Sequence, residues 1–246
     1  GYGADIYTGN TTITLGVGET LNESHGYPNK YNGNLTVTRT GEGKINLFMM
    51  GHAGISGNFS FTNLHGNSGE DYINKNNSPT APIQGTINID VNLEIAFGFQ
   101  LFQIKGIVNN TAGGTINIAN QIDVSLQNNT LKADINITSL RLGNGPVTIN
   151  GNIITGNFLL NNLDGIQVYT GGNQFNGTTS FMVTNVLLVT GYSGLGADTY
   201  NGNTSITIGN WADLYESYSY GNQYNGNLTV TRTGISSGRS TILFNA

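Results

Sequence analysis

Aromatic side chains gather in the C-terminal part of this sequence. Six tyrosines lie between positions 192 and 224, and the only tryptophan, Trp211, lies among them. Exposed aromatic rings stack on sugar rings or anchor a protein partner, because they combine a flat apolar face with a polar edge. The candidate residues for contact with a surface glycan or a partner are therefore Trp211, Tyr215, Tyr218 and Tyr220.

A second interpretation of the tyrosines is an aromatic stack along the fold. Four of the 12 tyrosines in the chain stand two places before a repeated Gly-Asn motif, namely Tyr7, Tyr31, Tyr200 and Tyr224. Rings at one fixed place in a repeat come to lie on one another when the repeats stack. This spacing makes the stack the favoured interpretation for most of the aromatic residues.

Asparagines in N-x-[ST] triplets are the second kind of candidate site, because such triplets accept N-linked glycans in secreted proteins. Eleven occur in the chain. Most lie in or beside the repeated Gly-Asn motif, where turn geometry already accounts for the Asn and the Thr. The better glycan acceptors are those in predicted loops: Asn22, Asn76, Asn109 and Asn128.

Carboxylates and histidines are too scattered to predict catalysis. The chain has 14 acidic residues and three histidines, and we find neither a cluster nor a metal-ligand spacing such as H-x-x-x-H. Glu70 and Asp71 are adjacent, but we expect a solvated pair in a polar loop over 65–82. Asp5 and Asp198 faintly resemble the ligands of glycine-rich calcium turns, and a turn-capping role is favoured. We therefore predict no enzyme, no metal and no cofactor.

Two copies of one long segment determine how all these residues are positioned. Residues 3–41 and 196–234 lie 193 positions apart, and 26 of their 39 paired positions are identical. With weaker similarity the copies extend over 3–48 and 196–244. Self-similarity of this kind is typical of repeat architectures. We predict a single solenoid segment over 1–246, taken as a window of a longer tandem-repeat chain.

A shorter period lies within the long one. Glycines followed by alternating residues recur at 9, 33, 57, 85, 114, 156, 177, 202 and 226. The wide gap between 114 and 156 is filled if Ile135 and Ile137 belong to a rung that has lost its glycine. Eight rungs then fill the long repeat, so each rung takes about two dozen residues, a period typical of solenoids. Less regular second strands are expected at 45–50, 101–105, 166–170 and 241–245.

Alternation after each glycine predicts the fold. Apolar residues two and four places on, with Asn, Thr or Ser between them, indicate a strand with one buried and one solvated face. Glycine and asparagine tolerate the positive φ of tight corners. We therefore predict an all-β protein, a right-handed parallel β-helix of roughly ten coils. At about 4.8 Å per coil, it would form a rod on the order of 50 Å long.

Composition suggests where such a rod would work. Only 9% of the residues are charged and the net charge is −5, which argues against nucleic-acid binding. No stretch reaches the ~20 apolar residues of a membrane span, so we expect no membrane insertion. Cysteine is absent, so neither disulfides nor thiolate metal sites are expected. The uncharged polar surface suits an extracellular, cell-surface location.

The G-N-x-[TS]-[IVF]-T rungs in an Asn-, Thr- and Gly-rich chain resemble the repetitive β-helical regions of large bacterial surface proteins. The similarity is to filamentous-haemagglutinin-type and autotransporter-type adhesins, and more loosely to long adhesins of gliding Bacteroidetes. It implies a non-enzymatic stalk, fibre or adhesive shaft that self-associates or continues as a longer covalent array. Two alternatives remain: a β-helix that binds or cleaves polysaccharide, and an ice-binding solenoid that uses outward Thr-x-Thr pairs.

Overall fold

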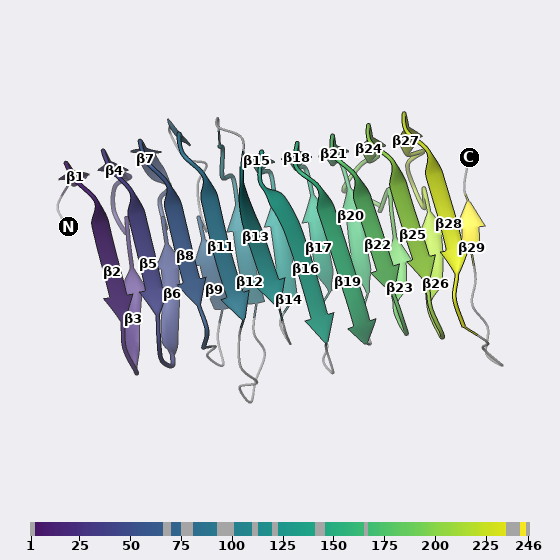
Figure 1. Cartoon of the computed structure of the whole chain (residues 1–246), viewed down its shortest axis with the longest axis horizontal. Coiled ribbons are helices and arrows are strands. Elements are labelled where there is room, and N and C mark those ends of the chain that lie inside the picture. Colours follow the sequence, from purple (N-terminus) through teal and green to yellow (C-terminus); the bar gives the residue numbers. More distant parts are fainter. Residues whose placement is uncertain are drawn as a thin grey trace.

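The protein is a long stack of β-coils (Figure 1). The computed structural model describes residues 3–65, 70–74, 81–92, 101–109, 113–119, 123–140, 146–164, 167–234 and 242–244. Every regular element in these ranges is a strand, and every strand pairing is parallel. The predicted all-β solenoid is confirmed. Within the same ranges, no helix is long and apolar enough to cross a membrane.

Three faces form each coil, and ten strands build the first of them, the front sheet. Its strands alternate inward and outward side chains. They are β2 (Thr11–Leu15), β5 (Leu35–Arg39), β8 (Phe59–Asn63), β11 (Ile87–Asn92), β13 (Gly114–Ala119), β16 (Asp134–Leu140), β19 (Phe158–Asp164), β22 (Thr179–Val183), β25 (Thr204–Ile208) and β28 (Leu228–Arg232).

The rear sheet also has ten strands. These are β3 (Glu19–Asn22), β6 (Gly43–Leu47), β9 (Glu70–Ile73), β12 (Leu101–Lys105), β14 (Asp123–Gln127), β17 (Val147–Asn150), β20 (Val168–Gly171), β23 (Leu187–Val189), β26 (Asp213–Glu216) and β29 (Ile242–Phe244). The predicted strand at 101–105 matches β12, and the other three predicted second strands overlap β6, β20 and β29.

A narrow third face closes each coil with shorter strands. A four-stranded and a five-stranded sheet make up this face, and single bridges from Ile83 to Asn109 and from Val108 to Thr130 join them. The strands are β1 (Ile6–Tyr7), β4 (Asn29–Tyr31), β7 (His52–Ile55), β10 (Ala81–Ile83), β15 (Thr130–Leu131), β18 (Ile153–Ile154), β21 (Gln174–Phe175), β24 (Thr199–Tyr200) and β27 (Gln223–Tyr224).

The coils follow the predicted period. Eight steps along the front sheet lead from β2 to β25. The first residues of these strands, Thr11 and Thr204, are 193 positions apart, so a coil averages about two dozen residues. Ile135 and Ile137 do form the predicted rung without a marker glycine, in β16. Figure 1 shows front strands pointing down and rear strands pointing up as the chain advances rightwards, which is the right-handed sense that crossovers between parallel strands adopt.

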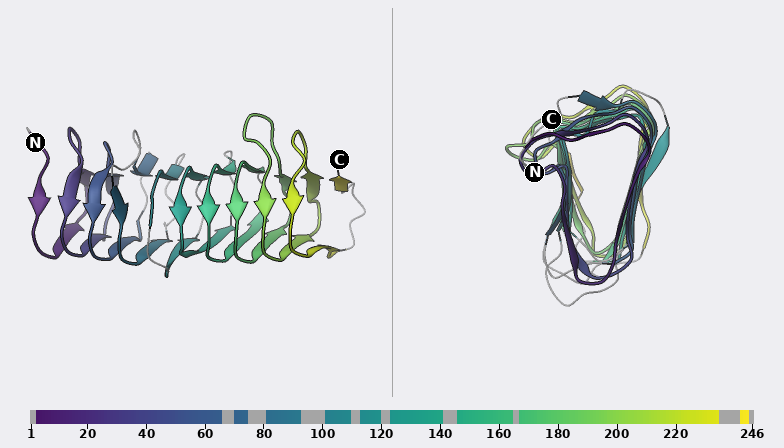
Figure 2. Two further views of the ribbon diagram at one scale, coloured as in Figure 1. Left: turned by 90° about the horizontal axis from the view of Figure 1, so that it is seen from above. Right: turned by 90° about the vertical axis from the view of Figure 1, so that its left-hand side faces the viewer.

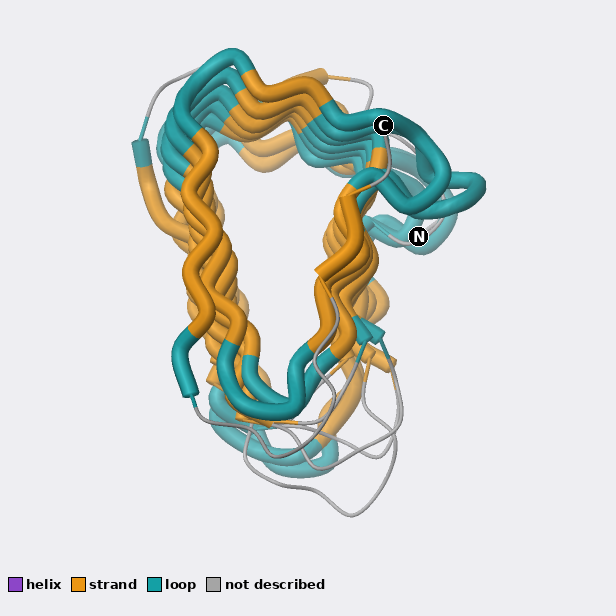
Figure 3. Tube along the Cα trace, turned by 90° about the vertical axis from the view of Figure 1, so that its right-hand side faces the viewer, coloured by secondary structure: helices purple, strands orange, loops and turns teal. Residues whose placement is uncertain are grey.

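Inward side chains form one continuous hydrophobic core. In β5, for example, Leu35, Val37 and Arg39 are buried while Thr36 and Thr38 are more exposed. Phe59 and Phe61 of β8 lie directly over Leu35 and Val37. Seen along the axis, the strands of successive coils superpose around this core (Figure 3). Each coil therefore buries its apolar side chains against its neighbours as well as across its own interior, where Phe158 of β19 lies 5.1 Å from Phe175 of β21.

The marker glycines are not all equivalent in space. The sequence pattern aligns Gly114 with Gly85, whereas the structure pairs Gly114 with Ile87 and Ile116 with Ile89. The register therefore steps by two residues between β11 and β13. A step of two keeps every side chain on its own face, so the core continues unbroken. Gly114 is required here, because its φ is 91° and a Cβ would lie 2.0 Å from the Ile87 carbonyl oxygen.

The predicted polar loop over 65–82 is wrong in part. Residues 70–73 form β9 of the rear sheet and 81–83 form β10 of the narrow face. Composition hid β9 because a charged pair opens it, yet Asp71 and Tyr72 are buried. Two of the described loops project at the corner between the rear sheet and the narrow face. Figure 2 shows them near the C-terminal end, at residues 190–198 and 217–222.

Candidate functional site

A ladder of buried amides holds the corner between the rear sheet and the narrow face. Asn129, Asn152 and Asn173 occupy one position in successive coils. The Asn152 Oδ1 accepts hydrogen bonds from the Asn129 backbone N–H at 3.0 Å and from its Nδ2 at 2.9 Å. Asn173 repeats both bonds to Asn152, and each Nδ2 also donates to a backbone carbonyl. Buried polar groups are thereby satisfied between coils.

Asp198 occupies the next position of this amide ladder. Its Oδ1 accepts from the Asn173 N–H at 3.0 Å and Nδ2 at 2.8 Å, while its Oδ2 accepts from the Thr170 hydroxyl at 2.6 Å. Burial raises the pKa of Asp198 above its ordinary value, although these hydrogen bonds oppose the shift. The Asp198 carboxylate therefore caps the turn of the preceding coil, as favoured from the sequence. Asp5, its counterpart in the first copy, makes the same backbone contact to Asn29 that Asp198 makes to Asn222, both at 2.8 Å.

A buried glutamate network follows the ladder in both copies of the long repeat. Glu23 accepts hydrogen bonds from the Ser24 hydroxyl at 2.5 Å, Asn29 Nδ2 at 2.8 Å and the Tyr31 hydroxyl at 2.6 Å. Burial and the Glu23 charge raise the pKa of Tyr31 far above its usual range, so the phenol stays protonated and donates. The second copy has the same network around a buried glutamate, made by Glu216, Ser217, Asn222 and Tyr224.

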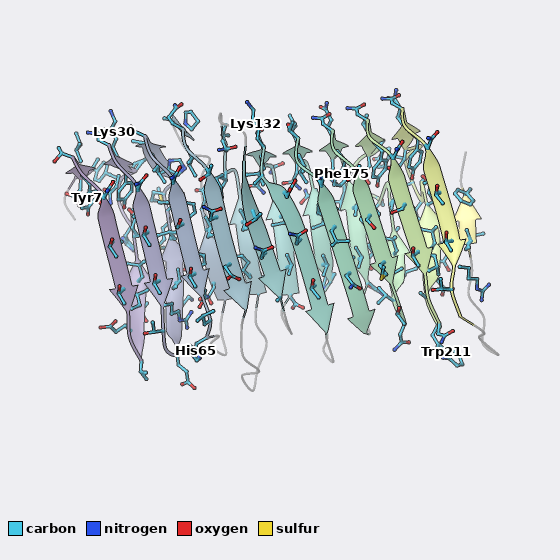
Figure 4. All side chains as sticks on the ribbon, viewed as in Figure 1. Tyr7, Lys30, His65, Lys132, Phe175 and Trp211 are labelled. Atoms are coloured by element: carbon cyan, nitrogen blue, oxygen red, sulfur yellow. The ribbon has the colours of Figure 1, made fainter. Side chains whose placement is uncertain are left out.

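Aromatic rings stack inside the narrow face, as the favoured interpretation predicted. Tyr7 lies on Tyr31 with centroids 4.9 Å apart and planes 4° from parallel. Tyr200 lies between Phe175 and Tyr224, at 5.1 Å and 4.8 Å, with both pairs 6° from parallel. Figure 4 labels Tyr7 and Phe175 along this upper part of the rod. These tyrosines belong to the framework of the coils.

Four other tyrosines surround a groove on the outer surface, which we call the tyrosine groove. Its walls are Tyr169, Tyr192, Tyr215 and Tyr218, and Leu187, Val189, Ser193 and Ser219 complete the lining. The groove is open to solvent and has a volume of about 680 Å³, within the size range of small-molecule sites. It spans three coils, because Tyr169 of β20 pairs with Val189 of β23, which pairs with Tyr215 of β26.

The rings of the tyrosine groove contact one another. Tyr192 packs on Tyr169 with centroids 4.2 Å apart, and Tyr218 lies 6.3 Å from Tyr192 with planes 17° apart. Tyr215 meets Tyr218 at 5.9 Å. Partial burial, and then the neighbouring Tyr192, raise the pKa of Tyr169. Val189 pairs with both Tyr169 and Tyr215 and is buried.

The structure divides the predicted contact residues. Tyr215 and Tyr218 line the groove, whereas Trp211 precedes β26 and lies at the opposite end of that strand, on the lower edge in Figure 4. Trp211 is 58% exposed and Tyr220 46% exposed, and neither lines the groove. Sequence reasoning missed Tyr169, because only the pairing of β20 with β23 brings that residue beside the loop that carries Tyr192.

Comparison with known proteins adds no relative to this geometry. A scan against protein-family models found no match, and searches of curated proteins and of solved structures found none either.

The predicted glycan acceptors have different environments. Asn22 and Asn128 are exposed, although the Asn22 Oδ1 accepts from Asn46 Nδ2 at 2.7 Å. Asn109 is buried, and its Nδ2, the atom that would carry the glycan, donates to the Gly85 carbonyl oxygen at 2.6 Å. This geometry does not favour a glycan at Asn109. Asn76 lies outside the described residues.

Asp71 is not the solvated loop residue predicted from the sequence. It is buried in β9 and pairs with Arg39, whose Nη1 lies 3.0 Å from Asp71 Oδ2. Its Oδ1 accepts the Ile45 backbone N–H at 2.8 Å. Burial raises the pKa of Asp71 and lowers that of Arg39, and the pairing opposes both shifts. Residues 32 positions apart are joined here, so local sequence gave no signal.

Outward Thr-x-Thr pairs form a regular array over only part of the front sheet. Thr14, Thr38 and Thr62 follow one another in register. The same column then continues through an aspartate and two asparagines to Leu159, which is 37% exposed. A neighbouring column includes the exposed Met182. Within the described residues, no three His, Asp or Glu side chains are grouped as metal ligands would be.

Proposed function

We propose that this chain is a segment of an extracellular structural protein, the shaft, stalk or filament of a cell-surface adhesin or of a self-assembling fibre. The observation that carries the proposal is the unbroken front sheet, in which ten strands pair in parallel from β2 to β28. A structure that grows by adding similar coils gains length without changing its cross-section. Length and rigidity are what a shaft requires.

Cohesion between coils supports this mechanical role. Each buried Ile, Val, Leu or Phe contributes about 1.5–3 kcal/mol of burial free energy before entropy is counted. Backbone hydrogen bonds, the amide ladder and the stacked rings add directional contacts along the same axis. Outer amides extend the pattern, since the Asn225 side chain donates to Asn201 and that of Asn201 donates to Asn176, both at 2.6 Å.

Four buried carboxylates support a structural role rather than catalysis. Glu23, Asp71, Asp198 and Glu216 are buried and accept hydrogen bonds from the framework. A catalytic acid or base must instead reach a substrate. Reuse of the Glu-Ser-Asn-Tyr network in the second copy of the long repeat fits a longer array of such units, whether covalent or self-associated. The proposed protein would be of the filamentous-haemagglutinin or autotransporter type of adhesin.

The two alternative functions are not supported equally. Ice binding requires a flat, regular outer array, and the interruptions at Leu159 and Met182 do not favour it. Binding of polysaccharide is favoured by one specific observation, the tyrosine groove, and it is compatible with a shaft that carries the groove on its side.

Electron microscopy of the native material, combined with a denaturing gel, tests the shaft. Thin filaments with a denatured band much larger than the 26.1 kDa of this chain indicate a covalent stalk. Filaments that dissolve to a band of about that mass indicate a polymer of subunits. Absence of any filament from native material would refute the proposal.

A further inference from the structure

The two copies of the long repeat differ at the residues that face the tyrosine groove. Asn22 in the first copy corresponds to Tyr215 in the second, and His25 corresponds to Tyr218. The Glu-Ser pair between these positions is identical in both copies and makes the same buried hydrogen bonds. The coil therefore folds in the same way with or without the two tyrosines.

This internal comparison separates the framework from the surface. Tyr224 is retained in both copies, as Tyr31 in the first, and its ring is stacked in the narrow face and bonded to the glutamate. Tyr215 and Tyr218 lie outside that stack, and Tyr218 is 49% exposed. Tyr215 is half-buried. Partly exposed rings that the fold does not require, gathered around a groove, are typical of a binding surface.

Among the residues that the structure describes, all eight that line the groove are uncharged. Leu187 and the tyrosine rings supply apolar surface, and four tyrosine and two serine hydroxyls supply donors and acceptors. Asp213 pairs with Leu187 in the neighbouring strand but is not part of the lining. Such a lining offers no partner for a charged ligand, and it suits a neutral one with many hydroxyls.

The dimensions of the groove favour a sugar chain over a protein. Eight residues line it, whereas a stable protein interface takes about 20–30 residues from each side. Tyr169 and Tyr215 lie two strands apart, or about 9.6 Å, with the smaller Val189 between them. Tyr192 packs on Tyr169 and Tyr218 lies beside Tyr215, so the four rings form a partly exposed aromatic surface on which the face of a sugar ring can pack.

We propose that the tyrosine groove binds an uncharged polysaccharide. The C–H faces of the sugar rings pack on the tyrosine rings, which bury apolar surface while their hydroxyls remain solvated. Sugar hydroxyls exchange hydrogen bonds with the tyrosine and serine hydroxyls along the rim. The open groove allows a long chain to cross it. Binding here is independent of the shaft function, because a shaft without any ligand would still assemble.

Affinity gel electrophoresis of the full chain tests the proposal, with hydroxyethylcellulose, galactomannan and dextran as neutral probes and alginate as an anionic probe. We expect at least one neutral polysaccharide to retard the chain and alginate not to do so. Replacing Tyr218 by Ala should weaken the binding about two- to tenfold, the scale of one aromatic contact.

Matched variants come from the chain itself. The double variant Tyr215→Asn and Tyr218→His carries the residues of the first copy on the same framework, so it should fold normally by circular dichroism and lose the retardation. Trp211→Ala and Tyr27→Ala remove exposed rings outside the groove and should bind as the wild type does. Glycan binding that the double variant retains, binding of alginate alone, or no retardation by any neutral probe would overturn the proposal. Analytical ultracentrifugation would also overturn it if the wild type is an oligomer and the double variant a monomer, because the loss of retardation would then come from dissociation and not from the groove.

Discussion

Removal of one rung of the buried amide ladder should destabilise the protein far more than removal of an equivalent amide outside. Asn152→Ala deletes four hydrogen bonds: two that its Nδ2 donates, to Asn173 Oδ1 and the Leu126 carbonyl oxygen, and two that its Oδ1 accepts from Asn129. At about 1 kcal/mol net for each bond, the loss is about 4 kcal/mol. Water cannot replace these bonds readily, because the site is fully enclosed.

Asn157 provides the matched control. It is exposed, and its Oδ1 accepts the Thr178 N–H at 3.1 Å and the Thr178 hydroxyl at 2.7 Å in the next coil. Asn157→Ala should cost less than about 1 kcal/mol, because water takes over both bonds. Urea unfolding followed by circular dichroism measures the free energy of unfolding of each variant. Equal losses for the two variants would refute the reasoning that burial gives the inner ladder its strength.

Three further predictions concern buried ionisable groups. Asp198→Asn should raise the melting temperature near pH 7, because burial raises the pKa of Asp198 and makes its ionised form unfavourable in the folded state. This gain should vanish as the pH falls to about 3.8, where an unfolded aspartate also becomes protonated. A gain in melting temperature that is unchanged at pH 3 would contradict this. Burial lowers the pKa of His52 to about 4 from 6.5, so the wild type should lose stability as the pH falls between these values, and His52→Gln should lose less in a thermal melt over that window. Arg39→Met leaves Asp71 buried without its cation and should lower the free energy of unfolding in urea by about 3–5 kcal/mol. Adding Asp71→Asn should recover part of this loss. A double variant less stable than the single variant would show that the ion pair is not responsible.

The period of the coil was predictable because it rests on patterns that the chain repeats. Ile135 and Ile137 were assigned to a rung although Ala133 stands where a marker glycine was expected, because alternation alone indicates a buried strand face. The step of two residues at Gly114 was hidden for the same reason. A shift of two preserves the alternation of side chains, so only the pairing with Ile87 reveals it.

The site was less predictable than the fold, because it depends on neighbours that are distant in sequence. Asp71 looked solvated, since nothing near it in the chain reveals Arg39. Tyr215 and Tyr218 were predicted because aromatic residues are frequent in this part of the chain. The same argument pointed to Trp211, which lies at the other end of β26 and away from the groove. Tyr169 lies at the groove because of the register between β20 and β23. Strand register can be predicted from a single sequence only where the repeat is exact.

Parallel pairing along the axis determines how such a rod would respond to force. A pull on its two ends acts in line with the hydrogen bonds between coils, so these bonds would open one coil at a time rather than all together in shear. Each coil that opens releases about two dozen residues, or about 80 Å of extended chain. Neighbouring coils would keep their own contacts while it does so. A shaft built in this way would yield in increments under load, extend many times its coil height, and rewind when the tension falls.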